Sequence, residues 1–278
     1  MSSDISSLLM ITNLGWACGR VLRNIKETNP SEVIYFHQDN PLWNEKNPDY
    51  ANAISIFKTD PKIQDYERLG KLKPKEISSI TNYADLFDAL ADIIEENEDE
   101  FERIYLDCTG FPKGAVPVVL HLAGIYDNVY PIYNRSTIST RYIAQRDSLR
   151  SSDEGEGPEQ LPFTKIKTDW INKPESSEYQ LLKAAWSLVE KSTHPRAKKW
   201  NHKFSEKDLK DELEKMGGPL STKSIGEGPC NIRVGKAIPA LLDSGFFMKA
   251  YDAYERLRLS LPGYVLARRV FGMKRSGA

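Results

Sequence analysis

The stretch DCTGFPK, residues 107–113, combines residue types that can hold an anion. The Thr109 hydroxyl and the backbone N–H of Gly110 can donate to phosphate oxygens, especially where a helix begins. Lys113 adds a positive point charge, and the ring of Phe111 offers a surface on which a base could stack. The stretch follows one apolar run and precedes another, so we interpret it as a loop that forms one wall of a ligand pocket.

A second loop with a glycine follows the first apolar run of the chain. It contains Thr12, Asn13, Leu14, Gly15 and Trp16. A glycine turn lets the backbone come close to a ligand, and the indole could either stack on a base or pack on the helix that it precedes. These five residues are ligand-binding candidates together with Thr109, Gly110, Phe111 and Lys113.

The chain departs from the patterns of three reactive sites. Cys108 begins a loop similar to the Cys-x5-Arg loop of cysteine phosphatases, but Gly114 occupies the place of the phosphate-clamping arginine. The Thr-Gly-x-x-Lys order lacks the Gly-Lys-Ser/Thr of a nucleotide hydrolase, and no G-x-G-x-x-G fingerprint occurs. The four histidines have no partners at metal-ligand spacing. We therefore expect no catalytic residue, no metal and no cofactor, and we interpret Cys108 as a buried thiol.

Alternating strands and helices are expected to position the two loops. Apolar runs predict strands at residues 7–13, 32–37, 103–106 and 128–134, and helical spacing predicts helices at 16–26, 83–95 and 113–123. The last of these should become regular near Val116, because Pro117 fits only in a first turn. Residues 40–74 are interpreted as loops that could include one helix. The alternation predicts an α/β domain with a Rossmann-like parallel sheet, whose ligands bind at the carboxyl ends of the strands.

The net charge of −1 conceals two halves of opposite sign. Residues 174–278 carry 19 Lys and Arg against 12 Asp and Glu, a net charge of +7, which leaves −8 for the residues before them. Residues 151–162 are rich in Gly, Pro, Ser and acidic residues and cannot build a core. We expect a ligand-sensing domain at 1–150, a linker at 151–173 and a basic domain at 174–278.

The basic half resembles a winged helix-turn-helix domain over residues 176–265. A first helix is predicted at 177–189. A second should begin at Ser205, which can act as its N-cap and form a short-acid capping box with Asp208. A third should follow a cap at Asn231 and end at Gly245. Two strand-like runs follow, at 246–251 and 255–261. Pro239, inside the third helix, departs from the pattern. The fold class predicted for the chain is therefore α/β, with a mainly α winged-helix domain after the Rossmann-like sheet domain.

A winged-helix resemblance implies that the third helix lies in the major groove of DNA. Basic residues of that helix and of the wing would then contact phosphates or bases: Lys223, Arg233, Lys236, Arg256 and Arg258. Winged helices also bind proteins or form dimers, and each of these charges could instead be a solvated surface group.

The N-terminal half resembles the CRISPR-associated Rossmann fold (CARF) family. The likeness is carried by residues 11–15 (ITNLG) and 107–113, each following a strand. The family often has a Gly-Gly-Thr-Lys-like stretch at the second place, where Thr109, Gly110 and Lys113 match here. A CARF sensor followed by a winged helix is a known arrangement of transcriptional regulators. The resemblance implies a homodimer that binds a cyclic oligoadenylate across its two-fold axis.

We expect a ligand-responsive regulator that binds double-stranded DNA and whose dimer geometry changes when the cyclic oligonucleotide binds. One alternative is an enzyme, a metal-independent ring nuclease or other phosphodiesterase that cleaves the cyclic oligoadenylate or RNA. In that case Thr12, Thr109 and Lys113 would support attack by a ribose 2′-hydroxyl. Another alternative is an adaptor whose winged helix binds protein.

Composition places the protein among soluble globular chains, with 40% hydrophobic and 28% charged residues. No apolar stretch approaches the roughly 20 residues that a membrane helix needs. The first seven residues contain Asp4 and no basic residue, which disfavours a secretory signal. Three scattered cysteines, Cys18, Cys108 and Cys230, fit a reducing compartment better than a disulfide framework. We expect a cytoplasmic protein that does not bind membranes.

Overall fold

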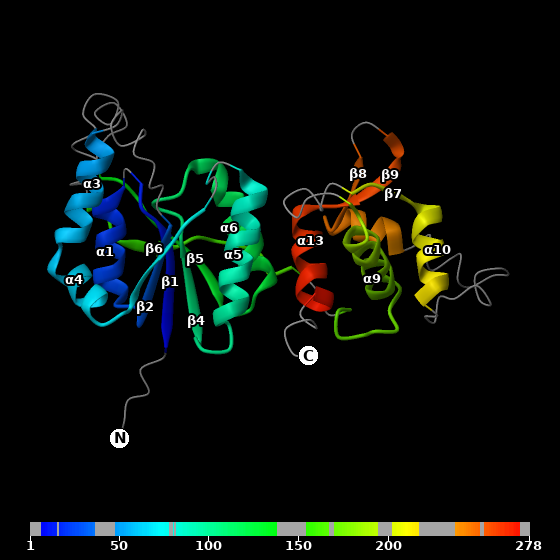
Figure 1. Ribbon diagram of the computed structural model, residues 1–278, viewed down its shortest axis with the longest axis horizontal. Coiled ribbons are helices and arrows are strands. Elements are labelled where there is room, and N and C mark those ends of the chain that lie inside the picture. The colour runs from blue at the N-terminus through cyan, green and yellow to red at the C-terminus, as the bar shows by residue number, and fades with distance from the viewer. Residues whose placement is uncertain are drawn as a thin grey trace, which may run out of the picture. The chain divides into compact units, whose positions relative to one another are not determined.

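The chain divides into two compact units, Met1–Lys165 and Ile166–Ala278. The computed structural model describes residues 7–15, 17–36, 48–77, 80, 82–137, 154–166, 170–193, 202–216, 237–250 and 253–272, without the side chains of 48–53, 84 and 253–255. Figure 1 shows both units, with the elements labelled.

The described residues of the first unit form one six-stranded sheet. Its strands are β1 (Leu8–Asn13), β2 (Glu32–Phe36), β3 (Leu72–Lys75), β4 (Arg103–Asp107), β5 (Val129–Asn134) and β6 (Pro158–Gln160). They lie in the order β3-β2-β1-β4-β5-β6, and every neighbouring pair is parallel except β5 and β6. The predicted α/β architecture with a mostly parallel, Rossmann-like sheet is therefore confirmed.

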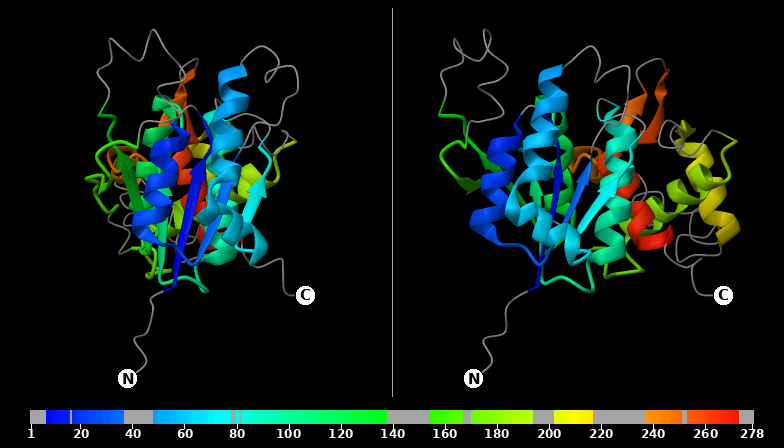
Figure 2. Two further views of the ribbon diagram at one scale, coloured as in Figure 1. Left: turned by 90° about the vertical axis from the view of Figure 1, so that its left-hand side faces the viewer. Right: turned by 60° about the vertical axis from the view of Figure 1, so that its left-hand side comes forward.

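Helices cover both faces of this sheet (Figure 1). One layer contains α1 (Cys18–Thr28), α3 (Pro48–Thr59) and α4 (Pro61–Arg68), and the other contains α5 (Tyr83–Asn97) and α6 (Val116–Ile125). The views in Figure 2 show the same two layers from other sides. The order of the strands explains the two layers. The connections from β1 to β3 and from β4 to β5 run in opposite directions along the sheet. Right-handed connections that run in opposite directions must cross opposite faces.

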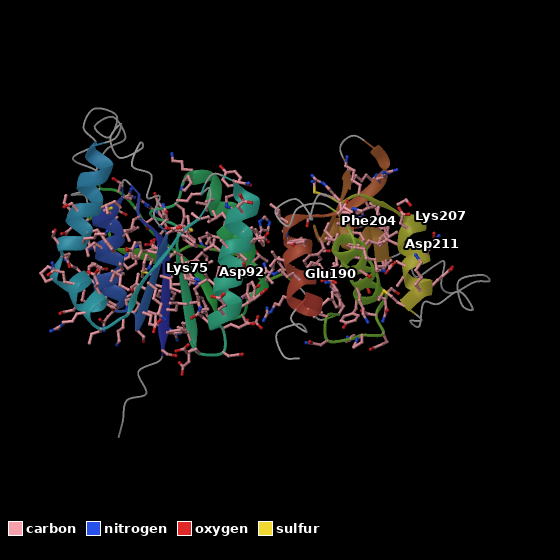
Figure 3. The ribbon with its side chains drawn as sticks, viewed as in Figure 1. Lys75, Asp92, Glu190, Phe204, Lys207 and Asp211 are labelled. Atoms are coloured by element: carbon pink, nitrogen blue, oxygen red, sulfur yellow. The ribbon has the colours of Figure 1, made fainter. Side chains whose placement is uncertain are left out.

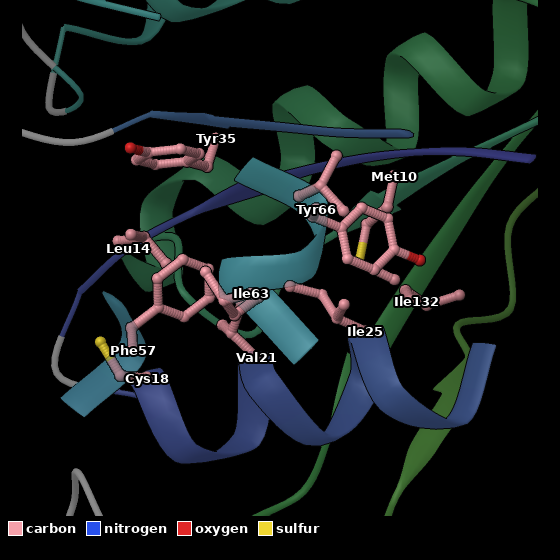
Figure 4. Packing of buried hydrophobic residues seen from close by; sticks show 11 residues of the cluster. Met10, Leu14, Cys18, Val21, Ile25, Tyr35, Phe57, Ile63, Tyr66 and Ile132 are labelled. Carbon is pink, nitrogen blue, oxygen red and sulfur yellow. The ribbon is translucent and has the colours of Figure 1, made fainter. Parts of the chain in front are cut away.

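The core on the α1 side closes around the buried face of that helix (Figure 4). Apolar side chains from strands and helices meet there: Met10, Leu14, Cys18, Val21, Ile25, Val33, Tyr35, Phe57, Ile63, Tyr66 and Ile132. Burying each large apolar side chain contributes roughly 1.5–3 kcal/mol. The helix ends at Asn29, which takes a left-handed conformation with φ 45° just before Pro30.

The predicted strands and helices of the first unit lie within a few residues of the observed ones, except in residues 40–74. The regular part of α6 begins at Val116, as Pro117 predicts, after the 3-10 turn Lys113–Ala115. Residues 40–74 were interpreted as loops that could include one helix, whereas their described part holds two helices, α3 and α4, and most of β3. The start of α4 carries a readable signal, because Asp60 accepts a hydrogen bond from the N–H of Lys62 at 2.9 Å and Pro61 is the first helical residue.

The segment predicted as a linker contributes an edge strand. β6 pairs antiparallel with β5, and Gly155 and Gly157 precede it with φ values of 68° and 110°. Backbone groups alone make this pairing, so the polar composition of the segment does not reveal it. The linker interpretation of 151–173 was therefore wrong for residues 158–160, which belong to the sheet.

In the second unit, the described residues hold helices and a three-stranded antiparallel sheet of order β7-β9-β8. The elements are α9 (Ser177–Glu190), β7 (Phe204–Ser205), α10 (Glu206–Met216), helical residues 237–243, β8 (Phe247–Ala250), β9 (Ala253–Leu259), α13 (Leu261–Ala267) and a π-helical turn, Arg268–Gly272. The sequence pattern predicted α9, α10, the helix before Gly245 and the hairpin, but not β7. In Figure 3, Phe204 marks β7, and Lys207 and Asp211 mark α10.

Helix ends in the second unit follow the predicted signals. The Ser205 hydroxyl accepts from the N–H of Asp208 at 3.1 Å, and the Asp208 carboxylate accepts from the Ser205 N–H at 2.7 Å, which confirms the capping box. Gly245, with φ 77°, follows the helical residues 237–243, as expected for a C-terminal glycine. The predicted cap Asn231 lies outside the described residues.

Among the described helices, none has the length and apolar character that crossing a membrane requires.

Candidate ligand-binding site

The two predicted loops meet at the carboxyl ends of neighbouring strands. β1 and β4 pair in parallel, with Leu8 opposite Arg103 and Ile11 opposite Leu106. From β1 the chain turns toward β2 on one side, and from β4 it turns toward β5 on the other. The strand order therefore reverses between β1 and β4. A crevice at such a switch point is where doubly wound sheets bind their ligands.

The loops touch each other through glycines. The Asn13 side-chain amide donates to the Gly110 carbonyl at 2.6 Å. A Cβ atom on Gly110 would lie 1.6 Å from the Asn13 carbonyl oxygen, and one on Gly15 would lie 2.9 Å from the Gly110 carbonyl oxygen. Side chains at 15 or 110 would separate the loops, so both glycines are explained by close approach of the two backbones.

A buried carboxylate lies beneath the loops. Asp107 is inaccessible to solvent and accepts hydrogen bonds from the Thr12 hydroxyl at 3.1 Å, the Asn24 amide at 3.1 Å and the Thr109 N–H at 2.9 Å. Burial raises the pKa of Asp107, and hydrogen bonds from Thr109, Asn24 and Thr12 oppose the rise. The carboxylate thus ties β1, α1 and the loop after β4 together.

The Thr109 hydroxyl extends this network to β5. It accepts from the Asn24 amide at 3.1 Å and from the backbone N–H of Asn134 at 2.9 Å. Thr12 and Thr109 are both buried. Their hydroxyls therefore hold the loops in place through hydrogen bonds within the protein. A ligand could reach these hydroxyls only if the loops moved.

Among the described residues, two buried acceptors near the loops have no hydrogen-bond partner, Asn13 Oδ1 and Asn24 Oδ1. The Asn13 side chain is 4% exposed, and its Oδ1 atom makes no hydrogen bond to the described residues, although its Nδ2 atom bonds to Gly110. A buried acceptor without a donor is costly unless water or a ligand supplies one. This oxygen therefore distinguishes Asn13 from Thr12 as a group that could still bind something.

Two cysteines near the loops are unreactive in this structure. Cys18 donates to the Gly15 carbonyl at 3.0 Å, and burial raises its pKa to about 12. Burial and the neighbouring charge of Asp107 also raise the pKa of Cys108. A nucleophilic or metal-binding cysteine needs its thiolate. The interpretation of Cys108 as a buried thiol is thus confirmed.

Apolar candidates belong to the core. Phe111 is 6% exposed, and its ring lies 6.2 Å from that of Phe36, tilted by 59°. Leu14 is buried and donates from its backbone to the Phe36 carbonyl at 2.8 Å. Stacking of Phe111 on a base would require its ring to leave this position. Trp16 lies outside the described residues.

Lys113 is the exposed member of the predicted set, and Gly110 is half-buried. Lys113 begins the 3-10 turn that leads into α6. The next residue, Gly114, faces the first residue of α5, because its Cβ would lie 1.8 Å from the Tyr83 hydroxyl oxygen. Tyr83 is 41% exposed, so a partly exposed aromatic ring lies beside Gly114, the residue that follows Lys113.

Sequence analysis missed Asn24, Asn134 and Tyr83. Asn24 carried a readable signal, because it lies three residues after Val21 on the buried face of α1, where a polar side chain needs a buried partner. Asn134 ends an apolar strand, and its position alone gives no hint of the contacts that it makes. Tyr83 fits the apolar stripe of α5 and is marked only by its contact with Gly114.

Two predicted DNA-binding residues lie on β9. Arg256 is exposed and pairs in register with Ser205, whereas Arg258 is half-buried and pairs with Met248. Leu257 and Leu259 alternate with them and are buried, as expected for a strand with one buried face. Lys223, Arg233 and Lys236 lie outside the described residues. Within the parts of the chain that the structure describes, no cluster of side chains could hold a metal ion.

No family model and no curated protein sequence matches this chain. Among solved structures, it is similar to Enterococcus italicus Csm6 bound to cyclic hexa-2′-fluoro-hexa-dAMP, with 14% identity and a TM-score of 0.39 over 86% of this chain and 63% of that one. It is also similar to protein VC1899 from Vibrio cholerae, with 10% identity and a TM-score of 0.33 over 95% and 65% of the two chains.

A third similar structure is Can2 from Sulfobacillus thermosulfidooxidans in complex with cyclic tetra-adenylate, with 12% identity and a TM-score of 0.28 over 93% of this chain and 61% of that one. The chain spans less than two thirds of the length of each of the three proteins. TM-scores below 0.5 are too low to establish a shared fold.

Proposed function

We propose that this protein is a ligand-responsive DNA-binding regulator whose first unit is a CARF-type sensor of a cyclic oligoadenylate. The observation that carries the proposal is the meeting of two glycine-containing loops at the reversal of strand order between β1 and β4. The point where the strand order reverses is where an open parallel sheet binds a ligand. The exposed Lys113 at its border favours an anionic one.

The chemistry of this edge suits a nucleotide with several phosphates. Gly110 is half-buried, so its backbone N–H could donate to a phosphate oxygen. Lys113 supplies the positive charge, and Asn13 Oδ1 can accept from a hydroxyl or amino group of the ligand. Thr12 and Thr109 would hold the loops in place through Asp107 rather than touch the ligand.

Calorimetric titration with cyclic tetra- and hexa-adenylate tests the sensor. We expect heat with at least one ring size, and Lys113→Ala should weaken that binding about 10- to 100-fold, the effect of losing one charge-assisted hydrogen bond. Lys71→Ala is the matched control, because Lys71 is an exposed lysine of the same unit just before β3, at the opposite edge of the sheet. Absence of heat with every cyclic oligoadenylate would remove the proposal.

We propose further that the second unit is a winged helix that binds double-stranded DNA. The support is its element order of helix, strand, helix, helix and hairpin, in which the first strand β7 pairs with the last strand β9. Arg256, exposed on β9, could contact a phosphate. Ligand binding in a homodimer would then change the spacing of two DNA-binding units.

Fluorescence anisotropy with duplex DNA at several salt concentrations tests the second unit. Affinity should fall with salt, and Arg256→Ala should lower the slope of log K against log salt by about 1, the effect of one phosphate contact. Lys183→Ala, on the exposed face of α9, is the control. Salt-independent or absent binding would favour an adaptor that binds protein.

The alternative of ligand cleavage gains no support from the hydroxyl groups at the switch point. Thr12 and Thr109 are buried and hydrogen-bonded to Asp107, Asn24 and Asn134. A group that assists an attacking 2′-hydroxyl must lie within hydrogen-bond reach of it. The sensor function therefore has the stronger support.

A further inference from the structure

A short segment before β6 is fastened to the sheet by one asparagine. This segment, residues 154–157, is called the strap. The Asn134 side chain donates to the Glu154 carbonyl at 2.9 Å and to the Arg20 carbonyl at 3.2 Å, and it accepts from the Gly157 N–H at 3.0 Å. A single amide group therefore holds both ends of the strap and the first turns of α1.

Other contacts hold the middle of the strap. Arg23 donates to the Gly155 carbonyl at 2.5 Å, and the Glu156 N–H donates to the Arg135 carbonyl at 2.9 Å. A Cβ atom on Gly155 would lie 2.0 Å from Asn134 Oδ1, and its φ of 68° also favours glycine. The strap thus lies directly on the amide of Asn134, with no room for a side chain between them.

The same asparagine reaches the candidate site through its backbone. Its N–H donates to the Thr109 hydroxyl at 2.9 Å, and the Thr109 N–H donates to Asp107 at 2.9 Å. Asn134 and Asp107 are fully buried, and Thr109 is 6% exposed. Hydrogen bonds therefore run without interruption from the loop after β4, through Asn134, to the strap, and the part of this network from Asp107 to Asn134 is buried.

Beyond the strap, the chain stays fastened to the first unit up to its last residue. β6 pairs with β5, and the Leu161 N–H donates to the Pro131 carbonyl at 2.9 Å. The Lys165 ammonium then donates to the carbonyls of Ala123 and Tyr126 at the end of α6, at 2.9 and 2.5 Å. The strap is thus the start of the segment that leads out of the first unit.

We infer that Asn134 is a positioning residue that couples the loop after β4 to the strap. A shift of Thr109 removes the acceptor of the Asn134 N–H, and the side chain that holds the strap belongs to the same residue. By reciprocity, release of the strap loosens the loop. The coupling is a property of the first unit alone. It rests on the proposed function only for the identity of the ligand whose binding would shift Thr109.

Amide hydrogen exchange of the full-length protein, read residue by residue by NMR, tests the coupling without a ligand. Thr109→Val removes the hydroxyl and keeps the shape. We expect the Gly157 and Glu156 amides to exchange about 2- to 10-fold faster, the effect of weakening one hydrogen bond. Thr109→Ser keeps the hydroxyl and should leave both strap amides as in the unchanged protein. The Val33 amide, which bonds to Lys71 on the far side of the sheet, serves as an internal reference.

The reverse experiment perturbs the strap from its partly exposed partner. Arg23→Ala should speed exchange of the Asn134 and Thr109 amides, whereas Arg68→Ala, which removes an exposed ion pair of α4, should not. If Arg23→Ala speeds only the strap amides, the inference is wrong. If Thr109→Val does not fold, the comparison of Arg23→Ala with Arg68→Ala decides the question by itself.

Discussion

Replacing Gly110 by alanine should separate the two loops of the candidate site. The new Cβ would lie 1.6 Å from the Asn13 carbonyl oxygen, and real Cβ atoms do not come closer than 3.0 Å to such a neighbour. The loops must therefore move apart by at least 3.0 − 1.6 = 1.4 Å. If the hydrogen bond from Asn13 Nδ2 to the Gly110 carbonyl, now 2.6 Å, lengthened by this amount, it would be broken.

The cost of this change can be estimated from its parts. A buried hydrogen bond whose partners are left unsatisfied costs about 1–3 kcal/mol, and overpacking costs typically about 1–3 kcal/mol. Alanine also restricts the unfolded chain, which offsets about 0.4–1 kcal/mol. We expect Gly110→Ala to lower the free energy of unfolding of the first unit by about 1–6 kcal/mol, with a central value of about 3 kcal/mol.

Gly15→Ala provides a control at the same contact. Its Cβ would lie 2.9 Å from the Gly110 carbonyl oxygen, so a shift of 0.1 Å relieves the clash. The expected change in unfolding free energy is within about 1 kcal/mol, because the small strain and the restriction of the unfolded chain oppose each other.

Urea unfolding, monitored by hydrogen exchange with mass spectrometry, measures the free energy of unfolding of both variants. Peptides that cover β1 and β4 report on the first unit separately, which matters because a chain of two units need not unfold in one step. Equal stability of Gly110→Ala and Gly15→Ala, within 1 kcal/mol, would refute the close contact between the loops.

Three further predictions concern charged groups. Burial raises the pKa of Asp107, so the contribution of this group to stability is lost as the pH rises above its ordinary pKa of 3.8. Urea unfolding should therefore show the unchanged protein losing stability relative to Asp107→Asn as the pH is raised from that value. Burial alone would raise the pKa of Glu212, but hydrogen bonds from Lys191 and Ser187 leave this pKa lowered. The free energy of unfolding of the second unit should therefore decrease as the pH falls below about 4.5, and it should decrease less in Glu212→Gln. Lys165→Met removes a cation from the end of α6 and should lower the thermal unfolding midpoint, at a cost of about 0.3–1 kcal/mol.

The fold of the first unit was predictable where burial is strong. β1 has five buried residues in succession, which is typical of a strand covered on both faces. The start of α6 followed from Pro117 alone, because the ring excludes an earlier regular turn. Alternation of such strands with amphipathic helices was sufficient to predict the parallel sheet and the edge where the loops lie.

Short edge strands escaped prediction because little side-chain burial marks them. β3 contains Lys73, Pro74 and Lys75, all exposed, and β6 contains the exposed residues Glu159 and Gln160. Their pairing uses backbone groups, which every residue except proline can supply in full. β7 escaped prediction for a different reason, because only two of its residues pair with β9 and so short a strand shows no alternation.

At the candidate site, the positions of the two loops were predicted from the sequence. The face of β1 on which the Thr12 side chain lies was not predicted. Met10 packs against α1, and Thr12 lies two residues later on the same face of β1. The period of two therefore places the Thr12 hydroxyl toward the sheet-facing side of α1, where Asn24 lies. Applying that period to the polar residue would have predicted a structural role for Thr12 from sequence alone.

Both outer strands of the sheet contain a proline. Pro74 lies in β3 and Pro158 in β6, and each removes one N–H from a strand that is outermost among the described residues. Lys73, Lys75 and Glu159 add charges to these borders. Such borders resist pairing with a strand of another molecule. Two copies of this protein should therefore associate through helices or loops rather than by extending one continuous sheet, which also protects the sheet from aggregation at its ends.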